Sequence, residues 1–393
     1  MASSLSQHSS QPSPRSNRRL VLAAQIAFLP TGILTTLLGP MLPILIVHWA
    51  MNDKQAGNLF LVQFLASLVG VQLSGVLLAR FGFRPAFLFG LLLMATGVAT
   101  LFLGSHIQGL FSVAAYGLGL GLIIPSDNLL IAEISTGSGL ESRAAAVSLL
   151  NFFWGVGAVF CSLMVAWTAA HNLLPFFLAA VGLFLVALAW FMRNLPFPEA
   201  AERGESSASW SELLKHPPIW LFAAVFFLYP GAETAVGGWI GSYVSRLGPT
   251  GLSIAAIMPA FFWIALTVGR AFGTAFLHHF SETRVARLGC GAGAAGIALT
   301  LWAPSLTGVI AGTLITGLSF ATLYPIMVSR LSHHFGVAAR SIGAVMFSLA
   351  MIGPAVIPWM VGEISHATGS LRAGLFLPLG ATVILFLIHL VDW

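Results

Sequence analysis

The chain has 393 residues, of which 58% are hydrophobic and only 7% carry a charge. Since about 25% of the residues of an ordinary soluble protein are charged, this composition excludes a water-soluble globular protein. The formal net charge of +5 does not indicate a nucleic-acid partner, because the basic residues form no patch with interleaved aromatic residues.

The apolar residues occur in long segments that follow one another along the chain. A bilayer core about 30 Å thick requires roughly 20 apolar residues per helix. We expect twelve such helices, at roughly residues 20–48, 55–79, 84–104, 107–132, 143–168, 172–192, 219–246, 251–277, 284–303, 306–331, 340–363 and 372–391. The pattern predicts an all-α membrane protein with the lipid bilayer as its surroundings.

The N-terminal tail, residues 1–19, is rich in Ser, Gln and Pro. It has no apolar run ahead of a small-residue cleavage site, so we expect a disordered cytoplasmic tail and no removable signal peptide.

Most basic residues fall on one side of the expected membrane. If the N-terminus is cytoplasmic, only Lys54, Arg246 and Arg372 lie at outer ends. The others lie at or near cytoplasmic ends: Arg15, Arg18, Arg19, Arg80, Arg84, Arg143, Arg193, Arg203, Lys215, Arg270, Arg284, Arg287, Arg330 and Arg340. This distribution predicts a multi-pass plasma-membrane protein, of the bacterial inner membrane, with both termini in the cytoplasm.

The two halves of the chain share a pattern at an offset of about 200 residues. The matching positions are Gly117, Leu118 and Pro125 with Gly317, Leu318 and Pro325; Gly155 and Ala158 with Gly353 and Val356; Arg143 with Arg340; and Gly32, Thr35 and Gly39 with Gly231, Thr234 and Gly238. We therefore expect two pseudo-symmetric six-helix bundles, residues 20–192 and 219–393, joined by a polar cytoplasmic linker, residues 193–218. Six-plus-six duplication is typical of secondary transporters with a substrate site near the membrane midplane.

The segment GVLLARFGFRP, residues 75–85, resembles the signature loop between the second and third helices of the major facilitator superfamily. The matching residues are Gly75, Leu77, Arg80, Gly82 and Arg84, whereas Ala79 stands where the family usually has Asp and Phe83 where it often has Arg. The resemblance implies the twelve-helix fold of that family, and it implies a gating role for Arg80 and Arg84.

Two further segments resemble the sugar:proton symporters related to the L-fucose and glucose/mannose permeases. YPGAETAVGGWIGSY is similar to their seventh helix, and GLGLGLIIPSDN is similar to their fourth, which ends in an Asn that corresponds to Asn128. The chain departs from the fucose-type pattern because its first helix contains no Asp and Ile124 replaces a Glu. The resemblance implies a hexose-like substrate and coupling to protons.

Glu233 is the acidic residue placed deepest in an apolar segment, 14 residues into the seventh expected helix. A charged side chain at the membrane centre costs about 2.5–3.5 kcal/mol, so we expect it to face a cavity or a partner. Burial favours the neutral form of a carboxyl group, which suits Glu233 to bind and release a proton. Alternatively, Glu233 is permanently protonated, or hydrogen-bonded to a nearby Tyr, and only stabilises the packing of the helices. We also expect Pro230–Gly231 and Gly237–Gly238 to weaken the helix around it.

Asp127 is the second acid within an apolar segment. It is a candidate for proton coupling, or for a gate in which it pairs with Arg143 or another cytoplasmic-side base.

The candidate substrate contacts are polar or aromatic side chains in the expected helices. Trp239 and Tyr243 follow Glu233, and an aromatic face suits the CH surface of a sugar; Trp239 is alternatively a lipid-facing anchor. Asn128 suits sugar hydroxyl groups. The remaining candidates, each alternatively an interhelical hydrogen-bond partner, are Gln63, Asn151, Trp154, Trp263 and Tyr324.

The sequence contains no motif for a catalytic nucleophile, a metal hydrolase or a phosphate loop, so we expect no enzyme, no cofactor and no metal. Cys161 and Cys290 have neither disulfide nor metal-site spacing. The function that we predict is symport of a monosaccharide with protons by alternating access, in a monomer. The alternatives are a sugar uniporter, an exporter of amphipathic compounds, and a membrane enzyme or a receptor without transport.

Overall fold

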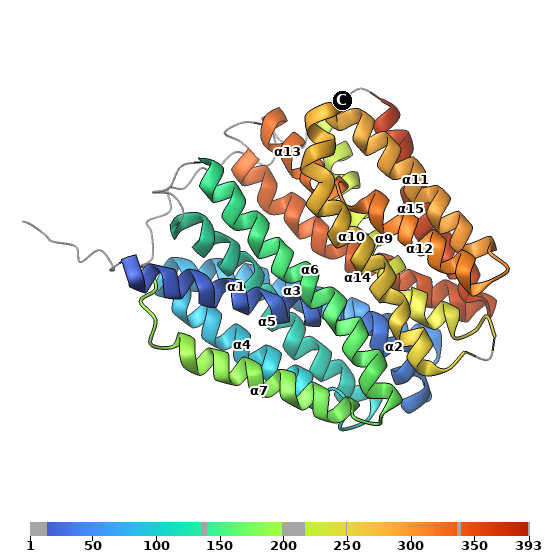
Figure 1. The fold of residues 1–393 in the computed structure, drawn as a ribbon, viewed down its shortest axis with the longest axis horizontal. Coiled ribbons are helices and arrows are strands. Elements are labelled where there is room, and N and C mark those ends of the chain that lie inside the picture. The colour runs from blue at the N-terminus through green and yellow to red at the C-terminus, as the bar shows by residue number, and fades with distance from the viewer. Residues whose placement is uncertain (1–13, 135–139, 199–216, 249, 336–338, 392–393) are drawn as a thin grey trace, which may run out of the picture.

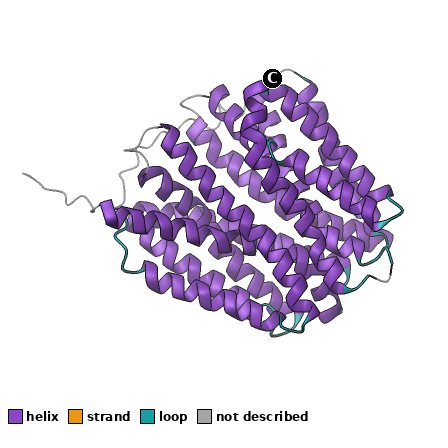
Figure 2. Cartoon of the chain, in the orientation of Figure 1, coloured by secondary structure: helices purple, strands orange, loops and turns teal. Residues whose placement is uncertain are grey.

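The structure is a computed structural model that describes residues 14–134, 140–198, 217–248, 250–335 and 339–391, and within these ranges it contains helices and no strand (Figures 1 and 2). Twelve segments of the described chain are long and apolar enough to cross a membrane, as expected. The helices before the polar linker are α1 (Pro14–Thr36), α2 (Leu38–His48), α3 (Asp53–Phe81), α4 (Phe83–Thr100), α5 (His106–Ile134), α6 (Leu140–Ala170) and α7 (Leu174–Met192). Those after it are α9 (Pro217–Val244), α10 (Leu252–His279), α11 (Glu282–Trp302), α12 (Leu306–Phe320), α13 (Leu323–Phe335), α14 (Ala339–Thr368) and α15 (Leu371–Leu390).

The two halves pack their helices in the same way, at an offset of about 200 residues. Gly117 on α5 lies against the carbonyl group of Gln63 on α3, and Gly317 on α12 lies against that of Phe262 on α10. In both pairs the backbones are too close to admit a Cβ atom. Two further contacts repeat in the same way. The contact of Gly97 with Ser112 corresponds to that of Gly296 with Gly312, and the contact of Gly90 with Gly119 corresponds to that of Gly289 with Ser319. Small residues allow helices in a membrane to approach closely, so the predicted pseudo-symmetry is confirmed as a shared set of packing contacts.

The expected weakening of the seventh helix is wrong, because α9 runs without interruption from Pro217 to Val244. Its glycines instead make room for neighbouring helices. Gly231 lies against Gly353 on α14, and Gly238 lies against the ring of Phe60 on α3.

The interruptions occur in the first and tenth membrane segments. Leu37 separates α1 from α2, and residues 321–322 separate α12 from α13.

The two bundles meet mainly where α3 packs on α14 and α6 packs on α10, with α2 also contacting α9 and α10. Figure 1 shows the helices of the first half, blue to green, alongside those of the second half, yellow to red. We call the side at which α1 begins and α15 ends the termini side, and the opposite side, at which α3 begins and α14 ends, the Asp53 side.

Polar contacts join the bundles on the Asp53 side. Arg246, in the turn after α9, forms a bidentate ion pair with Asp53, and Ser365 on α14 donates a hydrogen bond of 2.5 Å to the same carboxylate. Lys54 lies 3.3 Å from Glu363 of α14. Backbone contact between Gly57 and α14 adds to these interactions. The bundles are therefore held together on this side.

Candidate functional site

Glu233 on α9 faces protein partners. Its side chain is 13% exposed, and its Oε2 atom lies 3.8 Å from a terminal nitrogen of Arg270 on α10. The hydroxyl group of Tyr229, one turn earlier on α9, donates a hydrogen bond to the same oxygen. Glu233 was expected to face a cavity or a partner rather than lipid, and Arg270 and Tyr229 are such partners.

Tyr229 also connects Glu233 to a third helix. Its hydroxyl oxygen lies 3.1 Å from the carbonyl oxygen of Phe320, at the end of α12, where the tenth membrane segment is interrupted. A hydroxyl group has one proton, so Tyr229 donates either to Glu233 or to Phe320 at a given moment.

Arg270 is a candidate functional residue that the sequence reasoning missed. We assigned it to a cytoplasmic helix end, but α10 continues for nine residues beyond it, to His279, and its side chain is only 24% exposed. Its guanidinium group lies 5.5 Å from the ring centroid of Trp154, on α6 of the other bundle. That distance is within the range of a cation–π interaction. A single arginine within the apolar run of α10 was the signal that could have found it.

Trp154 and Trp263 lie against each other across the bundle interface. Their ring centroids are 5.6 Å apart and their planes meet at 84°, an edge-to-face arrangement. Trp263, on α10, is 5% exposed, and its Nε1 atom has no hydrogen-bond partner among the described residues. We call Tyr229, Glu233, Arg270, Trp154 and Trp263 the central cluster.

The central cluster has no charged counterpart in the first bundle. By the offset of about 200 residues, Glu233, Tyr229 and Arg270 correspond to Leu34, Pro30 and Val71. The ionisable groups therefore come from one bundle, and Trp154 is the contribution of the other.

Tyr324 is a fourth predicted residue near this cluster. It lies at the start of α13, is 38% exposed, and is close enough to Arg270 and Glu233 for electrostatic interaction with both.

Trp239 and Tyr243 are brought into the protein interior, with their polar atoms already bonded. Trp239 is fully buried and donates a 3.0 Å hydrogen bond to the carbonyl oxygen of Pro358 on α14, so the alternative of a lipid-facing anchor is wrong. The hydroxyl group of Tyr243 donates to the carbonyl oxygen of Leu301 at 3.2 Å.

Gln63 joins three helices of the first bundle. Its amide nitrogen donates to the carbonyl oxygen of Thr35 on α1, and its amide oxygen accepts from Tyr116 on α5, both at 3.1 Å. The side chain is fully buried. This is the geometry of an interhelical hydrogen-bond partner.

The two asparagine side chains bond to their own helices. Asn128 is half-buried and donates to the carbonyl oxygen of Ile124, at 2.8 Å. Asn151 is exposed and donates to that of Val147, at 2.9 Å.

Asp127 lies apart from the central cluster, fully buried on α5 in the first bundle. Neither carboxyl oxygen has a hydrogen-bond partner in the part of the chain that the structure describes. This is a rare environment for a carboxyl group. The predicted pairing with Arg143 falls outside the description, which does not include the Arg143 side chain.

The two arginines of the signature loop lie at exposed positions on the termini side. Arg80 is in the last turn of α3, and Arg84 donates a 3.0 Å hydrogen bond to the carbonyl oxygen of Leu195 in the same half of the chain. Among the described residues, neither forms an ion pair with the second bundle.

Twelve membrane-spanning segments in two pseudo-symmetric bundles, with an ionisable pair near the interface between the bundles, form the architecture typical of secondary transporters. The chain belongs to the Major Facilitator Superfamily, whose family model matches residues 25–358. It is therefore a multi-pass membrane protein of a family of transporters, and the expectation that it is not an enzyme is confirmed.

The chain is similar to several known proteins. The chain is 24% identical over 368 residues to a glucose/galactose transporter of Brucella abortus, covering 88% of this chain and 87% of the relative. It is 26% identical over 284 residues to bypass of stop codon protein 6 of Saccharomyces cerevisiae, covering 64% of this chain and 55% of the relative. The crystal structure of the E. coli fucose:proton symporter superposes with a TM-score of 0.64 at 19% identity, covering 95% of this chain and 98% of that one.

Proposed function

We propose that this protein is a secondary transporter that moves a hexose-like monosaccharide together with protons by alternating access. The observation that carries the proposal is the position of Glu233. Its carboxyl group is inside the protein, paired with Arg270, and Arg270 in turn contacts Trp154 of the opposite bundle. The names of the relatives, a glucose/galactose transporter and a fucose:proton symporter, support the sugar and the proton.

A proton on Glu233 would change the contacts across the bundle interface. When the carboxyl group is ionised, it attracts the Arg270 guanidinium group and accepts a hydrogen bond from Tyr229. Protonation removes that attraction, so Arg270 is freed to interact more strongly with Trp154 or with a sugar hydroxyl group. A ligand shifts a conformational equilibrium only by binding the two states differently, and a proton at this position satisfies that condition.

The sugar would bind beside the two tryptophan rings. The ring of Trp154 provides an apolar face, and the unpaired Nε1–H group of Trp263 provides a donor for a sugar hydroxyl group. Tyr324 and Asn151, both exposed, are further candidates for contact with the sugar. The other predicted contacts already form hydrogen bonds within the protein, and these would have to break before the same atoms could bind a sugar. They are Trp239, Tyr243, Gln63 and Asn128.

The distribution of basic residues makes the termini side cytoplasmic in this proposal. The Asp53 side, on which ion pairs join the bundles, is then the outer side, and the structure corresponds to a transporter closed to the outside. Arg80, Arg84 and Arg143 lie on the cytoplasmic side, where a gate would close in the opposite state. Asp127 is a second candidate for proton coupling, and the protein is proposed to act as a monomer in a bacterial inner membrane.

A sugar uniporter is the second candidate, because a tyrosine-bonded and arginine-paired Glu233 is also the geometry of an internal brace. De-energised proteoliposomes with a pH-sensitive dye inside, exposed to a panel of hexoses, distinguish the two. Symport predicts internal acidification when a transported hexose enters, and loss of that signal in Glu233→Gln. Hexose entry without any proton movement in the wild type would leave uniport as the function.

A further inference from the structure

Three side chains of α10 contact the other bundle at successive helical turns. They are Trp263, Thr267 and Arg270, whose spacing places them on one face of the helix. The rings of Trp263 and Trp154 are in edge-to-face contact, and Arg270 lies 5.5 Å from the centroid of the same Trp154 ring. Between them, the Thr267 side chain lies against Gly155 of α6, where a Cβ atom would come within 2.7 Å of the hydroxyl oxygen. We call Trp263, Thr267 and Arg270 the donor row.

Each member of the donor row has a buried polar atom without a hydrogen-bond partner among the described residues. The atoms are Nε1 of Trp263, Oγ1 of Thr267 and Nε of Arg270. The two nitrogen atoms can only donate, and the hydroxyl group can donate one proton. Because buried donors without partners cost free energy, three of them on one helix face indicate a place where a ligand rich in acceptor oxygens binds.

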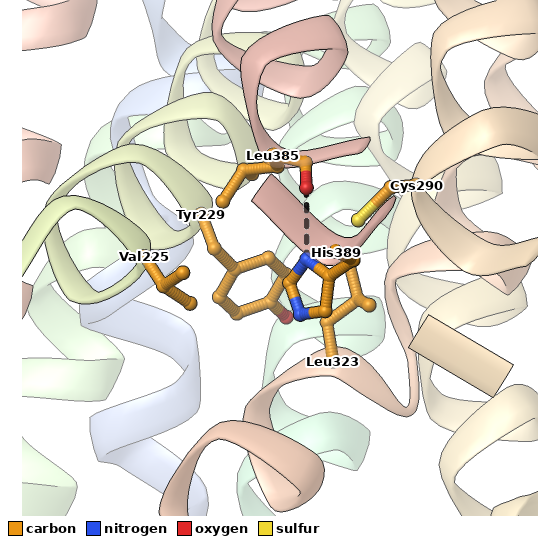
Figure 3. Close-up of a pocket in the computed structure, with 6 residues that line it drawn as sticks. All are labelled: Val225, Tyr229, Cys290, Leu323, Leu385 and His389. Atoms are coloured by element: carbon orange, nitrogen blue, oxygen red, sulfur yellow. Dashed lines mark hydrogen bonds between the residues drawn. The ribbon is translucent and has the colours of Figure 1, made fainter. Parts of the chain in front are cut away.

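The cavity next to Tyr229, between α9, α11, α13 and α15 of the second bundle, cannot take a monosaccharide (Figure 3). Its volume is about 10 Å³, which is close to the smallest volume that holds one water molecule. The donor row instead lies at the interface between the bundles, so a sugar gains access to it when α6 moves away from α10.

The charge of the central cluster depends on the proton at Glu233. Arg270 supplies the positive charge, and the Glu233 carboxylate lies 3.8 Å from it. Two phenol groups, of Tyr229 and Tyr324, interact with both members of this pair, and neither brings a positive charge. A proton on Glu233 takes away the carboxylate that pairs with Arg270. A partly buried charge without its partner is costly, so the protonated protein favours a ligand that brings a negative charge of its own.

We propose that the substrate is an acidic monosaccharide, such as a hexuronate, whose carboxylate binds Arg270 and Thr267 when Glu233 is protonated. This inference rests on the proposed function, in which Glu233 binds the coupling proton, and it narrows the substrate to sugars with a carboxylate. A guanidinium group binds a carboxylate through two parallel N–H groups, and Nε of Arg270 supplies one of them. The Thr267 hydroxyl group donates to the same carboxylate, and Trp263 donates to an oxygen of the sugar ring.

The transport cycle then moves no net charge. Glu233 takes up one proton from water, and the sugar carboxylate replaces it as the partner of Arg270. On the other side of the membrane the sugar leaves, Glu233 gives its proton to water, and its carboxylate pairs with Arg270 again. One proton and one anion cross together, and each favours the binding of the other. A neutral hexose with one proton would instead carry one positive charge across.

Sugar binding to the purified protein tests the substrate class. D-Glucuronate and D-galacturonate should bind at least about tenfold more tightly than D-glucose and D-galactose, which have the same ring without the carboxylate. Arg270→Gln should bring the ratio of the two Kd values close to one, and Thr267→Val should lower it about threefold. The ratio is decisive because a general structural defect weakens the binding of both classes. Arg193→Gln removes an exposed arginine after α7 and should keep the wild-type ratio.

Transport by the wild type provides a test that needs no variant. In proteoliposomes, glucuronate uptake should follow an imposed pH gradient and change less than about twofold when a membrane potential is imposed, whereas movement of a net charge would respond strongly. Strong dependence on the potential would overturn the inference. Equal or tighter binding of the neutral hexoses, or a Kd ratio that Arg270→Gln leaves unchanged, would also overturn it and leave the proposed function standing. If neither acidic nor neutral sugars are taken up, or if uptake ignores the pH gradient, the proposed function itself is wrong.

Discussion

Arg246 and Asp53 join the two bundles through a bidentate ion pair at the beginning of α3. The Asp53 carboxylate also accepts a hydrogen bond from Ser365 of α14, so a single side chain holds two separate segments of the second bundle. Asp53 is the more buried partner, with 12% of its side chain exposed against 38% for Arg246. Its removal should therefore loosen the Asp53 side more than the loss of any other polar contact described there.

We expect Asp53→Asn to favour opening on the Asp53 side. Because Arg246 is partly exposed, the loss should be on the order of 1 kcal/mol, which is about a fivefold change in population. Spin labels at Val47 and Leu247, two exposed positions of opposite bundles near this side, measure the distance by electron paramagnetic resonance. The distribution should gain a longer component. Lys54→Gln removes a more exposed pair and serves as the control; an identical change in both variants would contradict a special role for Asp53.

Glu233 and Arg270 should show coupled effects on stability. Glu233→Gln and Arg270→Gln each leave one partly buried charge without its partner, which costs about 1–3 kcal/mol of unfolding free energy. The double variant leaves no unpaired charge, so its loss should be smaller than the sum of the two single losses. Thermal unfolding in detergent measures all four proteins. Strictly additive losses would show that the 3.8 Å contact contributes nothing.

Trp263→Phe should weaken sugar binding while it preserves the aromatic contact with Trp154. The change removes the unpaired Nε1–H group, and a lost hydrogen bond is worth about 0.5–1.5 kcal/mol, a two- to tenfold rise in Kd. Binding of a transported hexose to the purified protein, followed by calorimetry, provides the measurement. Trp302→Phe replaces an exposed tryptophan of α11 and should leave Kd unchanged. If both variants bind equally well, Trp263 does not donate to the sugar.

Gly117→Ala and Gly317→Ala should destabilise the two bundles by similar amounts. Each adds a methyl group where a backbone carbonyl group already lies, and overpacking of this kind costs about 1–3 kcal/mol. Thermal unfolding should show a lower midpoint for both. Gly380→Ala on α15 adds a methyl group in open space and should be neutral or slightly stabilising, since Ala favours the helix by about 1 kcal/mol. A lower unfolding midpoint in only one of these two variants would argue against equivalent packing in the two bundles.

The number of membrane segments and the repeat could be predicted from the sequence because both depend on local composition. The thickness of the bilayer determines how long an apolar run must be, and small residues at a regular offset mark the close helix contacts. Glu233 was identified for the same reason, since a charge within an apolar run needs a partner wherever the helix lies.

The partners of the site residues could not be predicted, because they depend on the rotation and depth of each helix. Arg270 was placed at a helix end by its position in the apolar run, and its pairing with Glu233 becomes evident only when α9 packs on α10. Likewise, Gln63 and Trp239 have the residue types of substrate contacts, yet neighbouring groups of the protein already form hydrogen bonds with their polar atoms. The prediction that Pro230–Gly231 and Gly237–Gly238 weaken α9 was wrong because glycine is found at close helix contacts as well as at bends.

The correspondence of Glu233, Tyr229 and Arg270 with Leu34, Pro30 and Val71 makes the duplicated halves chemically unequal at the site. Under the proposed function, the second half would bind the coupling proton at Glu233, and the first half would respond through the contact of Trp154 with Arg270. Mutations that uncouple energy from transport should therefore gather in the second copy, whereas the first copy is free to vary in its selectivity for cargo.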